Sequence, residues 1–91
     1  MNALRMGSGK AAGNLAKHGV PFEEAATGFR DVLSATGADP DHSSDEERFI
    51  TFGMSTGGRL LAFAHIDRDD TIRIISARPA TPTERKIYEE G

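Results

Sequence analysis

Hydrophobic residues repeat with helical spacing in the first third of the chain. Between Pro21 and Phe29 they stand at positions i, i+3, i+4 and i+7, the spacing of a helix that buries one stripe. A shorter helix is expected over Lys10–Lys17 and is ended by Gly19, since glycine adopts the left-handed backbone that stops a helix. Its apolar side is expected to hold Ala11, Ala12, Leu15 and Ala16, and its polar side Lys10, Asn14 and Lys17.

From residue 31 onward the period changes to two, which is typical of half-buried strands. Strands are predicted over Asp31–Thr36, Arg48–Met54, Arg59–Ile66 and Thr71–Arg78, with a weak edge strand over Asn2–Arg5. Short, turn-rich connections make the last three strands antiparallel neighbours. The segment between residues 38 and 47 is expected to be a polar loop.

A final helix is predicted over Pro82–Glu90, because Thr81 and Glu84 have the spacing of a capping box and Pro82 suits the first helical position. The order of elements predicts an α+β fold with two N-terminal helices, a three- to four-stranded antiparallel meander sheet and a C-terminal helix. With 91 residues, the chain is expected to form one domain, 1–91.

Composition narrows the classes of function. The absence of cysteine excludes disulfides, thiolate zinc sites and thiol nucleophiles, and no signal peptide or membrane-length apolar run is present, so we expect a cytoplasmic protein without membrane contact. The formal net charge of −3 disfavours a generic basic nucleic-acid binder. Gly7–Lys10 lacks the remainder of a phosphate loop, and the acidic segment Asp39–Glu47 lacks the spacing of a calcium loop, so no cofactor or metal is expected.

Arginines are the more informative charges. Arg73 and Arg78 differ in parity, so only a bulge or the strand end at Pro79 lets both reach one face of the sheet. For any single arginine, a solvent-facing side chain is the more common explanation. Several arginines on one open face would instead form an anion-binding surface, because the guanidinium donors form a planar, permanently charged fork.

Three other side chains have possible roles in acid–base chemistry or hydrogen bonding. His18 is an acid–base candidate, because histidine is the residue type suited to proton transfer at neutral pH, although it stands where it could simply bind the carbonyls that end the first helix. Glu47 could act as a base or be surface charge before a strand, and Tyr88 could pack in the core or donate its hydroxyl to a site.

Two blocks of sequence resemble a known family. Asn14-Leu15-x-Lys17-His18-Gly19 and the run Ile72-Arg73-Ile74-Ile75-Ser76-Ala77-Arg78 are similar to the BrnT family, and the resemblance extends over about residues 10–91. The family usually has Trp-Asp where Met6 and Gly7 stand here, so this chain lacks an aromatic anchor and a helix-capping aspartate.

The resemblance implies a RelE-like ribonuclease toxin of a type II toxin–antitoxin system. Its partners would be an RNA substrate and a BrnA-type antitoxin with a ribbon-helix-helix part, through which alone the complex would bind operator DNA. A metal-free ribonuclease can use the RNA 2′-hydroxyl as nucleophile. We predict catalytic roles for His18, Glu47, Arg73 and Arg78 and RNA binding by Lys10, Lys17, Arg48, Arg59 and Tyr88. The alternative is a catalytically inactive module that only binds a partner in an autoregulatory DNA-binding complex.

Overall fold

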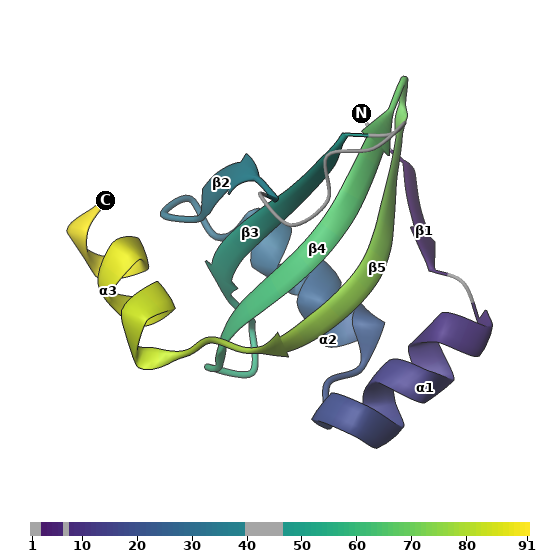
Figure 1. Ribbon diagram of the computed structural model, residues 1–91, viewed down its shortest axis with the longest axis horizontal. Helices are drawn as coiled ribbons and strands as arrows, with labels where there is room; N and C mark the ends of the chain where they lie inside the picture. The colour runs from purple at the N-terminus through teal and green to yellow at the C-terminus, as the bar shows by residue number, and fades with distance from the viewer. Residues whose placement is uncertain (1–2, 7, 40–46) are drawn as a thin grey trace.

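The computed structural model describes residues 3–6, 8–39 and 47–91, which form one five-stranded sheet with helices against it (Figure 1). The strand order is β1-β5-β4-β3-β2. Strands β2 to β5 form an antiparallel meander, as predicted, and β1 adds a fifth strand parallel to β5. The strands span β1 Ala3–Met6, β2 Ala35–Ala38, β3 Arg48–Met54, β4 Leu60–Arg68 and β5 Thr71–Pro79.

The predicted strand Asp31–Thr36 is wrong in its first half. Residues 31–34 form a turn, in which the Asp31 carboxylate accepts a hydrogen bond from the Leu33 amide and the Ser34 amide donates to the Asp31 carbonyl. These local bonds compete with strand pairing, so the strand begins only at Ala35. The predicted loop between residues 38 and 47 falls mostly on residues 40–46, which lie outside the described residues.

The described residues form three α-helices: α1 Ser8–His18, α2 Phe22–Thr27 and α3 Pro82–Glu90. The predicted helix Pro21–Phe29 is shorter than expected, because Gly28–Arg30 continues as a 3₁₀ turn. The capping box of α3 is confirmed: Glu84 N–H donates to Thr81 Oγ1 (3.2 Å), and Thr81 N–H donates to Glu84 Oε1 (2.9 Å). In the described part of the chain, no helix is long and apolar enough to cross a membrane.

The hydrophobic core lies between one face of the sheet and the first two helices, and Figure 1 shows α2 behind the strands. Its buried side chains come from α2, β4, β5 and the link after α1: Val20, Phe22, Ala25, Leu61, Phe63, Ile74 and Ala77. The helix α3 lies to one side, and none of its residues is buried. The opposite sheet face is therefore not covered by α1 or α2, and it is the face to examine for a site.

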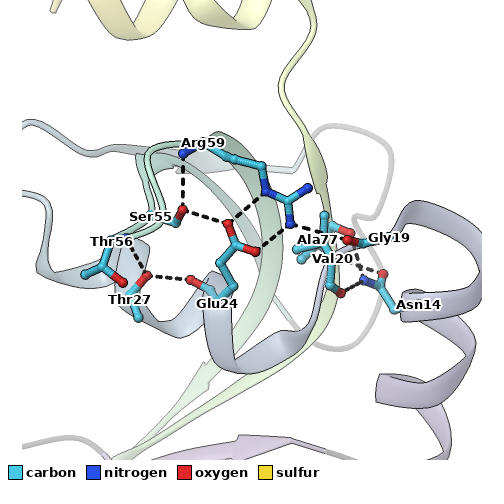
Figure 2. Close-up of polar contacts among 9 residues, drawn as sticks. All are labelled: Asn14, Gly19, Val20, Glu24, Thr27, Ser55, Thr56, Arg59 and Ala77. Carbon is cyan, nitrogen blue, oxygen red and sulfur yellow. Dashed lines mark hydrogen bonds and ion pairs between the residues drawn. The ribbon is translucent and has the colours of Figure 1, made fainter.

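The helix α1 docks through a polar residue, which corrects the predicted apolar side. Asn14 is buried, whereas Leu15 is half exposed and Ala12 and Ala16 are exposed. The Asn14 amide donates to the carbonyls of Val20 (2.9 Å) and Ala77 (2.8 Å) and accepts from the Ala77 amide (3.0 Å) (Figure 2). The described pairing of β5 with β1 ends at Ile74. Beyond that point, Asn14 supplies the hydrogen-bond partners that the backbone amide and carbonyl of Ala77 require.

Candidate functional site

A β-bulge in β5 decides where its arginines lie. Along β4 and β5, Ala64 pairs with Ser76 and the next residue, His65, pairs with Ile74, so Ile75 is the extra residue. Ile74 and Ala77 both point into the core although they differ in parity. Arg73 and Arg78, each adjacent to one of these core residues, consequently lie together on the opposite face.

The same face carries arginines from the neighbouring strands. Arg48 of β3 pairs with Ile66 of β4, which pairs with Arg73 of β5, so the three stand in one row across the sheet. Two strand spacings place the Cα atoms of Arg48 and Arg73 about 10 Å apart, within joint reach of one phosphate. Arg5 of β1 continues this row in backbone register. We call the surface formed by Arg48, Arg73 and Arg78 the arginine face.

Arg78 occupies a second row, opposite Ala62. Arg73 and Arg78 are five residues apart along β5, which corresponds to about 16 Å of extended chain and somewhat less at a bulge. They are therefore suited to bind different phosphates of one nucleic-acid strand. Arg78 is bidentate to Glu84, with Nη1–Oε1 2.6 Å and Nη2–Oε2 2.7 Å. The guanidinium lowers the pKa of Glu84, which therefore stays ionised at neutral pH.

Arg73 is exposed and Arg48 is half-buried. Within residues 3–6, 8–39 and 47–91, neither guanidinium makes a hydrogen bond or ion pair. Arg68 belongs to the same face by its parity with Ile66, and it was missed because the strand was predicted to end at Ile66. Arg48, Arg68 and Arg73 thus share this face near the β4–β5 hairpin.

Arg59 does not join the arginine face. It stands before β4, and Figure 2 shows its guanidinium against Glu24 of α2. Arg59 Nε donates to Glu24 Oε2 (2.9 Å), Arg59 Nη2 donates to Glu24 Oε1 and to the Gly19 carbonyl, and Ser55 Oγ also donates to Glu24. The arginine lowers the pKa of Glu24. The contact holds α2 against the β3–β4 turn, so the observed role of Arg59 is to stabilise the fold.

The predicted residues on α1 also lie away from the arginine face. The helix lies along the edge of β5, where Asn14 bonds the in-plane carbonyl and amide of Ala77, while Arg73 and Arg78 point out from the sheet face opposite the core. Lys10 and Lys17 are exposed and His18 is half-buried. In the described portion of the protein the His18 imidazole makes no hydrogen bond. Glu47 is exposed and directly precedes Arg48 at the start of β3, so of the predicted acid–base residues it is the one next in sequence to the arginine face.

Tyr88 holds α3 in place. Its hydroxyl donates to Asp31 Oδ2, which also accepts the Met54 amide (2.8 Å). The carboxylate raises the pKa of Tyr88, and the Tyr88 hydroxyl is the main cause of the lowered pKa of Asp31, with the Met54 and Leu33 amides adding to it. Tyr88 is therefore engaged as a tether between α3 and the turn at Asp31.

A pH titration tests this tether. Because the pKa of Asp31 is lowered in the folded protein, its contribution to stability is present above the pKa of the unfolded carboxyl group and is lost as the pH falls through the folded pKa. Because the pKa of Tyr88 is raised, its contribution to stability is lost as the pH rises through the folded pKa. Because Tyr88 is the sole tyrosine and tryptophan is absent, near-ultraviolet absorbance reports it alone. We expect a higher ionisation midpoint in the folded protein than in denaturant, and a lower one in Asp31→Asn. Equal midpoints in all three would contradict the tether.

A chain of hydrogen-bonded polar side chains, with Thr51 and His65 buried at its centre, was not predicted from the sequence. Thr51 Oγ1 lies 2.7 Å from both Thr36 Oγ1 and His65 Nε2, and His65 Nδ1 lies 2.6 Å from Asp67 Oδ1. His65 is 2% exposed and is surrounded by the rings of Phe29, Phe49 and Phe63, so it is closed to a substrate. The shared parity of Phe63, His65 and Asp67 was the available signal, but parity does not reveal hydrogen-bond partners.

A family model described as the ribonuclease toxin BrnT of type II toxin–antitoxin systems matches residues 7–84. The chain belongs to the BrnT family. A solved structure, the ribonuclease toxin BrnT of Brucella abortus, matches with a TM-score of 0.65 and 20% identity over 89% of this chain and 99% of that chain, which shows a shared fold. No curated protein matches. As a BrnT-family ribonuclease toxin, the protein has a protein antitoxin as its partner.

Proposed function

We propose that this BrnT-family toxin is a metal-independent endoribonuclease that inhibits translation and growth, and that the arginine face binds its substrate. The observation that carries the proposal is the row in which Arg48 and Arg73 stand on either side of Ile66, on one face, without a described carboxylate partner. Two guanidinium groups about 10 Å apart at Cα can bind one phosphate from both sides and stabilise the charge that develops on it.

Cleavage by the RNA's own 2′-hydroxyl suits this arrangement. Glu47 beside Arg48 would take the 2′-hydroxyl proton, the 2′-oxygen would bond to phosphorus, and the 5′-oxygen would leave with a proton from water. The products are a 2′,3′-cyclic phosphate and a 5′-hydroxyl. We favour Glu47 over His18 as the base, because Glu47 directly precedes Arg48, whereas the helix that carries His18 lies along the edge of β5. Arg78 would bind a neighbouring phosphate.

The exposed lysines of α1 would have a secondary role. Because α1 packs along β5, an RNA strand that passes around the part of β5 beyond its described β1 pairing would meet Lys10 and Lys17 on one side and Arg78 on the other. With a formal net charge of −3, the affinity for RNA should be weak and should fall steeply with salt. The RelE-like relationship implied by the sequence resemblance remains a prediction.

Arg73→Ala should lower RNA cleavage by roughly 10²-fold, since it removes one of two charged donors from the reacting phosphate. Purified protein is incubated with an RNA and with the matching DNA, with and without chelator, and the ends of the products are identified. We expect cleavage of RNA alone, unchanged by chelator. Arg85→Ala is the matched control, because Arg85 is exposed on α3 and, among the residues that the structure describes, its side chain makes only a long ion pair (3.9 Å) with Glu89.

Three results would contradict the proposal: equal cleavage of DNA, loss of activity with chelator, or full activity of Arg73→Ala. A wild-type protein that binds its antitoxin but neither cleaves RNA nor arrests growth would instead favour the non-catalytic alternative, an interaction module within an autoregulatory complex.

The antitoxin is proposed to be of the BrnA type, with a ribbon-helix-helix part that binds operator DNA. An inhibitor of the proposed reaction must cover the row of Arg48 and Arg73, and acidic side chains would complement it. Reversing the charge with Arg73→Glu should therefore weaken co-purification with the product of the adjacent gene. Unchanged co-purification would show that the inhibitor acts from another surface.

A further inference from the structure

The two ion-paired arginines differ in which edge of the guanidinium their carboxylate occupies. A guanidinium presents five N–H donors, and two of its edges can hold an anion in bidentate fashion: the end edge with Nη1 and Nη2, and the side edge with Nε and Nη2. Glu24 takes the side edge of Arg59, and Gly19 takes a further Nη2 proton. Arg59 consequently retains no complete edge for a second anion.

In Arg78 the carboxylate occupies the end edge of the guanidinium, not the side edge. Glu84 binds Nη1 and Nη2, and the Pro79 carbonyl receives a long bond from Nη1 (3.4 Å). The Nε–H and the second Nη2–H have no acceptor among the residues that the structure describes. These two donors form the side edge of Arg78. This edge therefore remains able to bind an anion while Glu84 occupies the end edge.

The Glu84 carboxylate that binds Arg78 is itself held in place by the capping box of α3. Glu84 is the third residue of α3 and closes the capping box with Thr81, so its Oε1 accepts from the Thr81 amide as well as from Arg78. Its side chain is 16% exposed, against 35% for Arg78. A long arginine side chain on an open face normally loses rotamer freedom on binding an anion, and here that freedom is already restricted.

We propose that Glu84 is a positioning residue, which holds the end edge of Arg78 so that the side edge is preorganised to bind an RNA phosphate. This deepens the proposed function, because Arg78 lies on the same face as the row of Arg48 and Arg73. A phosphate and Glu84 would then share one guanidinium, with the anion on the solvent side. Arg59, whose side edge is closed, takes no part and serves only to join α2 to the β3–β4 turn.

The first test observes anion binding without requiring catalysis. Inorganic phosphate is titrated into the isotope-labelled full chain, and the arginine Nε–H resonances are followed by NMR. We expect a saturable shift of the Arg78 Nε–H and none of the Arg59 Nε–H, with the Arg78 response lost in Glu84→Gln. An unmoved Arg78 resonance, or an equal shift at Arg59, would overturn the proposal, whether or not the protein cleaves RNA.

The second test is a double-mutant cycle on kcat/KM for RNA with Arg78→Ala, Glu84→Gln and the double variant. Glutamine keeps the capping box, so α3 is retained. We expect each single variant to lose about 10-fold, chiefly through a higher KM, and the double variant to lose no more than Arg78→Ala. Additive losses would show that Glu84 merely stabilises α3 and would overturn the proposal. Glu24→Gln is the control and should cleave within about 2-fold of the wild type.

Discussion

Replacing Asn14 by leucine is expected to remove about half of the free energy of unfolding. The change leaves three buried backbone groups without partners: the Val20 carbonyl and both the carbonyl and the amide of Ala77. Each unsatisfied buried group destabilises by about 1–3 kcal/mol, so we expect a loss of about 3–5 kcal/mol. A domain of this size has only about 5–10 kcal/mol in total.

Urea unfolding followed by circular dichroism measures this loss. Leu15→Ala is the matched control in the same helix, because Leu15 is 49% exposed, and it should lose less than about 1 kcal/mol. Asn14→Asp adds a second criterion: the carboxylate retains the acceptor for the Ala77 amide but turns its charge toward two carbonyl oxygens. It should be more destabilising at neutral pH than in acid. A leucine variant as stable as the wild type would refute the role of Asn14 in docking α1.

The second large effect is expected at Gly53 of β3. A Cβ at this position would lie 2.7 Å from the carbonyl oxygen of Gly28, and because that atom is backbone, the strand or the 3₁₀ turn must move. We expect Gly53→Ala to destabilise by about 3 kcal/mol, in the range of an overpacked core. The displaced turn precedes Asp31, so the tether to Tyr88 should loosen as well.

Gly37 of the adjacent strand provides the control for Gly53. A Cβ there meets no atom within 4 Å, so Gly37→Ala should change stability by no more than about 0.5 kcal/mol or raise it slightly, by reducing the freedom of the unfolded chain. Thermal unfolding of the two variants side by side measures the difference. Similar losses for both would mean that strand conformation, and not contact with Gly28, explains the effect.

The elements of this protein could largely be read from local pattern. Alternation of apolar and polar residues predicted β3 over Arg48–Met54 as observed, and the Thr81–Glu84 spacing predicted the start of α3. These features depend on neighbours two to four residues away, so the information is contained in short stretches of sequence. Parity likewise showed that Arg73 and Arg78 could share a face only through an irregularity.

Long-range contacts accounted for what the pattern could not show. The bulge at Ile75 is defined by pairing with β4, and it aligns Arg73 and Arg78 on one face. Asn14 appeared polar and outward by spacing, yet its partner Ala77 lies 63 residues away. The contact of Arg59 with Glu24, 35 residues away in the sequence, likewise keeps Arg59 off the arginine face. Local periodicity reports which way a side chain points relative to its own element, whereas hydrogen-bond partners and shared faces depend on which elements meet in the folded chain.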